Sequence, residues 1–68
     1  MSADTLAAAL PREMVRVTKI VGQYRQVEMG FIAAALMEAA VERAQKAIEA
    51  GDVVAMLRAY ADLQGYEL

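Results

Sequence analysis

Basic side chains gather in one stretch of this otherwise acidic chain. The 68 residues carry a formal charge of −2, yet four of the seven basic residues lie between Leu10 and Val27, where the net charge is +3, leaving −5 for the rest. At 100° per residue, Arg12, Arg16 and Lys19 fall with two glutamines in an arc of about 80°. Such a basic stripe could bind phosphates, contact an acidic protein surface, or simply face water.

Nucleic acid is the least favoured of these partners. The acidic remainder of the chain would repel the same phosphates that the stripe attracts, and the sequence has no recognised DNA-binding motif. A solvated face or a protein contact is therefore expected, and direct nucleic-acid binding is kept only as an alternative. Arginine suits a protein contact because its planar guanidinium can bind a carboxylate through two hydrogen bonds.

Carboxylates recur on one face of the second predicted helix. Glu38, Glu42 and Glu49 form this acidic row, with Gln45 between them. Glu38 and Glu42 are four residues apart and could share a metal ion, but the chain has no His and no Cys, so we expect a charged surface pair and no metal site. The row could instead meet the basic stripe of a second subunit or contact an external protein. Each exposed ion pair would contribute about 0–1 kcal/mol.

The residue types that most catalytic chemistry requires are missing. Without His, the chain lacks the side chain whose unperturbed pKa suits acid–base catalysis near neutral pH, and without Cys it lacks thiolates and disulfides. No glycine-rich phosphate loop and no nucleophile–base pair stand out either. We therefore expect neither an enzyme nor a bound cofactor.

The first of three predicted helices follows Pro11. Residues 1–10 are expected to be flexible or weakly helical, because a residue that precedes proline is biased out of the helical region. Pro11 suits the first position of a helix over 11–27, where its missing N–H costs nothing. Apolar residues at three- and four-residue spacing give this helix one buried stripe, opposite the basic one. They are Met14, Val17, Val21 and Tyr24.

A second helix is predicted over 31–50, after a joint at residues 28–30. Its Ala-rich stripe, spaced alternately by four and three residues, resembles a coiled-coil seam, and its small side chains allow close approach of another helix. The stripe consists of Ala33, Met37, Ala40, Ala44 and Ala47, and we expect it to be a dimer seam or the core. Phe31 projects with the acidic row instead. With Met29 and Ile32, it is expected to be covered by a neighbouring helix or by a partner.

The third helix is predicted over 53–64. Gly51 suits a left-handed C-cap and Asp52 an N-cap, so the junction is short and predicts an antiparallel hairpin of the last two helices. Its expected apolar face consists of Val53, Met56, Leu57, Tyr60 and Leu63. The predicted fold class is therefore all-α, a single three-helix domain over 11–68. With fifteen Ala, one Phe and no Trp the core is thin, so we expect a homodimer.

Nothing in the sequence predicts a membrane location. No N-terminal stretch has the pattern of a signal peptide, and the longest uncharged apolar run, from Met29 to Met37, is too short to cross a bilayer. The polar face of the second helix is acidic, which is the wrong sign for anionic lipid. We expect a cytoplasmic protein with no membrane partner.

Two stretches of the chain carry a family resemblance. "LPREMVRV…QYRQV" (10–17 and 23–27) and "AIEAGDVVAMLRAYADLQGYE" (47–67), with the Ala-rich helix between them, resemble small proteins encoded by phages and prophages of Pseudomonas and related bacteria. The resemblance covers about residues 10–67. One group of this kind consists of quorum-sensing anti-activators, small helical homodimers that bind a host LuxR-type transcriptional activator and block its DNA binding. Some members also act on a pilus assembly ATPase.

The resemblance implies a function in host inhibition. The chain would bind a host protein stoichiometrically in the host cytoplasm, and its acidic surface would complement the basic face of a DNA-binding protein. The partner-binding candidates are then Arg12, Arg16, Lys19, Phe31, Glu38, Glu42 and Glu49. Two alternatives remain: a small DNA-associated regulator that uses the basic stripe, and a structural subunit of a larger assembly.

Overall fold

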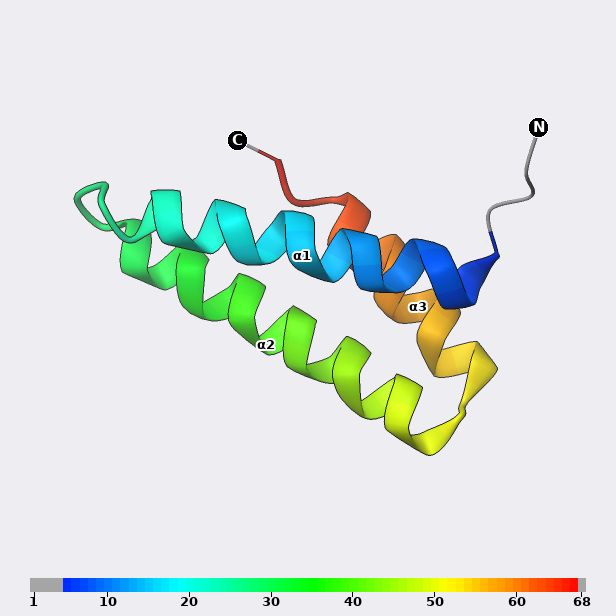
Figure 1. Cartoon of the computed structure of the whole chain (residues 1–68). Coiled ribbons are helices and arrows are strands. Elements are labelled where there is room, and N and C mark those ends of the chain that lie inside the picture. The colour runs from blue at the N-terminus through cyan, green and yellow to red at the C-terminus, as the bar shows by residue number, and fades with distance from the viewer. Residues whose placement is uncertain (1–4, 68) are drawn as a thin grey trace.

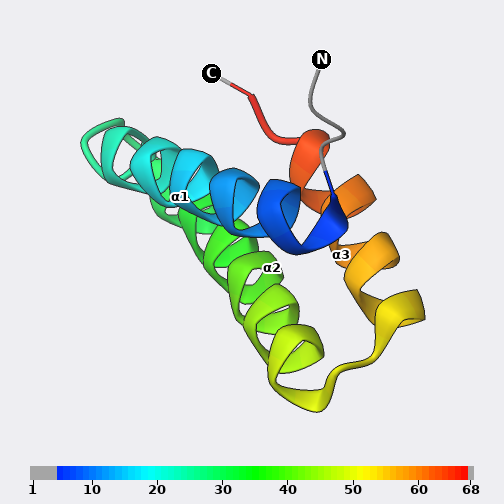
Figure 2. The ribbon, with the colours of Figure 1, turned by 45° about the vertical axis from the view of Figure 1, so that its right-hand side comes forward.

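Three helices make up the computed structural model, which describes residues 5–67. They are α1 (Leu6–Tyr24), α2 (Gly30–Ala50) and α3 (Val53–Gln64), and the described residues contain no strand, so the predicted all-α class is confirmed. α1 and α2 run in opposite directions from the turn that joins them and diverge away from it (Figure 1). α3 returns from the end of α2 toward the first half of α1 and contacts both helices (Figures 1 and 2).

The first helix starts earlier than the sequence predicts. Thr5 is its N-cap, and the Thr5 Oγ1 accepts a hydrogen bond from the Ala8 backbone N–H over 3.2 Å. The predicted helix start at Pro11 is therefore wrong, and residues 6–10, predicted to be flexible or weakly helical, belong to α1. Pro11 lies inside the helix, where proline removes a backbone hydrogen bond. Burial offsets this cost, because Leu10 is 0% exposed and a buried leucine contributes about 1.5–3 kcal/mol. The part of the prediction that concerns residues 1–4 lies outside the described residues.

The turn between α1 and α2 is tight. α1 ends at Tyr24 rather than Val27, and the Gly30 N–H donates to the Val27 carbonyl over 2.9 Å. A Cβ on Gly30 would lie 1.8 Å from the Tyr24 carbonyl oxygen, so only glycine fits there. Met29 is the one non-glycine residue with positive φ (67°) among the described residues. A left-handed backbone costs a residue with a Cβ about 1–2 kcal/mol.

The core lies where the three helices meet. Leu10, Val17 and Leu63 are fully buried in it, and half of its twelve buried apolar residues are alanines. The predicted face of α3 is wrong in part: Val53 and Leu57 are exposed, while Ala59 is buried. The helix is thus rotated by about 60° from the predicted orientation, at 100° per residue. Ala59 and the alanines of α2 are small, so the two helices can approach closely.

Candidate functional site

The Ala-rich stripe of α2 lies inside the single chain. Met37, Ala40, Ala44 and Ala47 are buried, and Ala33 is half-buried and packs against the core. Ala34, which the predicted stripe omits, is also buried. Because α1 and α3 of the same chain already cover this face, a homodimer would have to use other residues.

Arg16 of the basic stripe is engaged within the chain. Its Nε and one terminal nitrogen donate to the Glu13 carboxylate, each over 3.0 Å. The same guanidinium donates to the carbonyl oxygens of Leu63 (2.9 Å) and Tyr66 (2.8 Å), at and beyond the end of α3. It thus ties α1 to the end of α3, where the Leu63 carbonyl also accepts from the Tyr66 backbone N–H over 3.1 Å. The hydrogen bond with Glu13 raises the pKa of Arg16, against the opposing effect of burial.

The other two predicted cations of the stripe are exposed. Arg12 and Lys19 lie on the outer side of α1, one on either side of Arg16 along the chain. The structure therefore splits the predicted basic stripe into a structural arginine and two surface cations. Sequence reasoning missed this role, although Glu13, three residues before Arg16, is the signal that could have indicated a local ion pair.

All three carboxylates of the acidic row are exposed and have partners within the chain. Glu38 forms an ion pair with Arg25, which links the turn to α2. Glu42 lies 3.7 Å from the Lys46 ammonium, and Glu49 accepts a hydrogen bond from Gln45 over 3.1 Å. Exposed pairs of this kind contribute little to stability and leave the carboxylates accessible to a partner.

Large apolar side chains are exposed where α1 turns into α2. Val27 and Met29 lie in the turn, and Phe31, Ile32 and Leu36 lie on the first turns of α2; we call these five residues the turn patch. Phe31 is 64% exposed and Met29 63%. Ala35 and Ala39, also exposed, continue the patch along the helix. Large exposed apolar patches on soluble proteins are typical of interaction sites, which makes the turn patch a candidate.

The turn patch adjoins the acidic row. Phe31, Glu38 and Glu42 fall within an arc of about 40° on α2, at 100° per residue. The combined surface offers an apolar contact with carboxylates beside it. A complementary partner would present apolar side chains next to basic ones.

A second group of exposed apolar residues lies at the start of α3. Val53, Val54 and Leu57 are each more than half exposed there. Ala50 and Ala61 are exposed nearby in the sequence. This group is smaller than the turn patch and contains no aromatic side chain.

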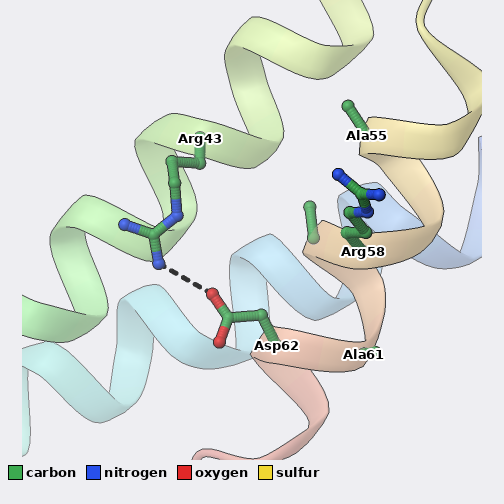
Figure 3. Close-up of a pocket in the computed structure, with 6 residues that line it drawn as sticks. Arg43, Ala55, Arg58, Ala61 and Asp62 are labelled. Carbon is green, nitrogen blue, oxygen red and sulfur yellow. Dashed lines mark hydrogen bonds and ion pairs between the residues drawn. The ribbon is translucent and has the colours of Figure 1, made fainter.

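A pocket between α2 and α3 contains charged side chains but no catalytic set. Arg43 of α2 and Arg58 and Asp62 of α3 line it with three alanines, and the Arg43 guanidinium binds the Asp62 carboxylate over 2.7 Å (Figure 3). Residues 5–67 hold no group of three or more potential metal-ligating side chains. Within that same range, no helix is long and apolar enough to cross a membrane.

Comparison of the chain with protein-family models, with curated proteins and with solved structures found no match.

Proposed function

We propose that this protein acts by binding another protein and inhibiting it stoichiometrically, with the turn patch as the contact surface. The observation that carries the proposal is the exposure of five large apolar side chains on the turn and the start of α2, beside an acidic row. Burying a Phe or Ile side chain in an interface contributes about 1.5–3 kcal/mol. Two such residues could therefore dominate a small interface.

The target follows from the sequence resemblance and the charge of the surface. A LuxR-type transcriptional activator of a bacterial host has a basic face for DNA, and the acidic row beside the turn patch would complement it. Occupying that face would block DNA binding. A pilus assembly ATPase is the second target to test.

A role in direct DNA binding has less support. Arg16, the middle residue of the predicted basic stripe, is held by Glu13 and by the end of α3, so the stripe has lost one of its three cations. A DNA-associated regulator would need the remaining two to bind phosphates against the field of an acidic protein.

The homodimer implied by the thin core and the resemblance would have to bury exposed residues. The turn patch cannot be fully covered by both a second copy and the target. We assign it to the target. Sedimentation equilibrium of the wild type and of the turn-patch variants tests this assignment, because loss of a dimer in those variants would show that a second copy covers the patch.

Affinity capture from a bacterial host lysate tests the function. The bait is the tagged full chain, and the lysate is divided into nuclease-treated and untreated halves. We expect one host protein in both halves. It should be lost when Phe31→Ser is combined with Ile32→Ser and retained with the control Val54→Ser, which removes an equally exposed apolar side chain elsewhere.

Three outcomes would contradict the proposal. Retention that disappears with nuclease would favour the DNA-associated regulator. Copurification at fixed ratio with other products of its own operon would favour a structural subunit. Equal capture by the patch variant and the control would exclude the turn patch as the contact surface.

A further inference from the structure

A groove runs between α1 and α2, away from the turn patch. Met14, Val15 and Thr18 line it from α1, and Val41, Gln45 and Ile48 from α2. No residue of α3 lines it, so it lies on the side of the α1–α2 pair that α3 leaves uncovered. Val15 is 56% exposed, while Met14, Val41 and Ile48 are half-buried and pack against the core. The floor of the groove is therefore apolar and fixed by the fold.

Charges of opposite sign flank this floor. Lys19 lines the groove on the α1 side. Glu38 and Glu42 line its continuation on the α2 side, opposite Val21 of α1. Lys19 is exposed and the two carboxylates are in exposed ion pairs, so each flank can interact with an occupant. Two members of the acidic row and Lys19 of the basic stripe thus flank one apolar groove.

The dimensions of the groove match a helix. From Pro11 to Val21 on α1, and from Glu38 to Ile48 on α2, the lining residues span about 15 Å at 1.5 Å per residue, which is about three helical turns. A helix lying there would pack on α1 and α2 much as α3 does on the other side. An occupant of uniform charge, such as nucleic acid or an anionic membrane, would be repelled by one flank.

We propose that this groove binds an amphipathic helix of a partner protein, with an apolar stripe, acidic side chains on one edge and basic side chains on the other. The apolar stripe packs on the Val15–Val41–Ile48 floor. The acidic edge faces Lys19 and the basic edge faces Glu38 and Glu42. The groove contains no residue of the turn patch, but its α2 flank shares Glu38 and Glu42 with the acidic row beside that patch. The variants of the turn patch and of Val15 therefore distinguish the two surfaces.

Designed peptides test the charge pattern directly. Three fluorescein-labelled helical peptides of about 14 residues share one Leu stripe and differ only at their edges: Glu on one and Lys on the other, Glu on both, or Lys on both. A helix can lie in a groove in either direction, and reversal exchanges its edges, so the mixed peptide is compared with the uniform ones. Fluorescence anisotropy with the full wild-type chain should give at least threefold tighter binding of the mixed peptide.

Charge-reversed variants of the protein should change which of the three peptides binds most tightly. Glu38→Lys with Glu42→Lys makes both flanks basic, so the peptide with Glu on both edges should become the tightest binder. Lys19→Glu should favour the peptide with Lys on both edges. Val15→Lys places a charge on the exposed floor and should weaken all three peptides at least tenfold, with unchanged circular dichroism.

A control variant and three contrary results complete the test of the groove. Phe31→Ser with Ile32→Ser alters only the turn patch and should leave the peptide affinities within twofold of wild type. An unchanged order of the three peptides in the charge-reversed variants would overturn the proposal. So would peptide binding that survives Val15→Lys, or a wild-type dimer that binds no peptide and dissociates with Val15→Lys.

Discussion

The exposed side of α2 changes character halfway along the helix. In its first half Phe31, Ile32 and Leu36 are apolar and more than half exposed. In its second half Arg43 pairs with Asp62, and Glu42 pairs with Lys46. Both halves surround the same buried Ala-rich stripe, so the fold accepts either kind of outer surface. The charged half is what a solvated helix needs, and the apolar half is explained by a contact with another molecule.

Substitution of two neighbouring alanines should give the largest difference in stability between the inner and outer faces of α2. Ala40 is 1% exposed, so Ala40→Glu would bury a charge without a partner and should destabilise the fold by more than about 3 kcal/mol, leaving the chain largely unfolded in circular dichroism. Ala39→Glu, one residue earlier, lies on the exposed side and should change stability by less than about 0.5 kcal/mol. A folded Ala40→Glu variant would show that the stripe is misplaced.

Substitutions in the basic stripe of α1 should also differ in their effect on stability, according to whether the residue is engaged within the chain. Arg16→Met removes the donors to the Leu63 and Tyr66 carbonyls and should lower the free energy of unfolding by about 1–2 kcal/mol, a value reduced by the partial exposure of the guanidinium. Lys19→Met, on the exposed side, should be neutral. Urea denaturation measures both variants, and equal stability of the two would refute the structural role of Arg16.

The acidic row should matter for binding more than for folding. Glu38→Lys with Glu42→Lys reverses two exposed carboxylates, and each such charge contributes about 0.2–1 kcal/mol, so target affinity should fall by up to about thirtyfold. Most of the loss should come from a slower association rate. At high salt, where charges are screened, the variant and the wild type should associate at similar rates. Surface plasmon resonance at two salt concentrations measures this. An unchanged association rate would remove the acidic row from the contact.

Substitution of Met29 by glycine should have a smaller effect on stability, and it should stabilise the fold. Its left-handed backbone is strained, and Met29→Gly relieves that strain at the expense of a more flexible unfolded chain, so a net stabilisation of about 0.5–1 kcal/mol is expected. Because Met29 also belongs to the turn patch, target binding should weaken at the same time. Gly30→Ala is the matched control, and it should destabilise because its Cβ would collide with the Tyr24 carbonyl.

Local patterns were sufficient to predict the all-α class, the junction between α2 and α3, and the burial of four of the five members of the Ala-rich stripe. The end of α1 was predicted three residues too late. Periodicity and caps are local properties, and Gly51 and Asp52 cap the helices as expected. The start of α1 could not be predicted, because burial of Leu10 in the tertiary core outweighs the local preference set by Pro11. The orientation of α3 depends in the same way on packing against the alanines of α2.

The candidate site was predicted in part. The sequence singles out Phe31 but leaves open whether a neighbouring helix covers it, and only the structure places it on the surface. The structural role of Arg16 could not be recognised from the sequence, because its distant acceptors are the backbone carbonyls of Leu63 and Tyr66, which have no sequence signature. Arg16 was therefore predicted to bind a partner. The groove between α1 and α2 also needed the structure, since it depends on which sides of two helices α3 leaves open.

Titration calorimetry of the captured host protein with two variants tests the central claim most directly. We expect Phe31→Ser with Ile32→Ser to weaken binding at least about a hundredfold, because two large apolar side chains would lose their burial. Val54→Ser should bind within about threefold of wild type, and both variants should keep the circular dichroism of the wild-type chain. Equal affinity of the two variants would contradict the assignment of the turn patch as the inhibitory surface.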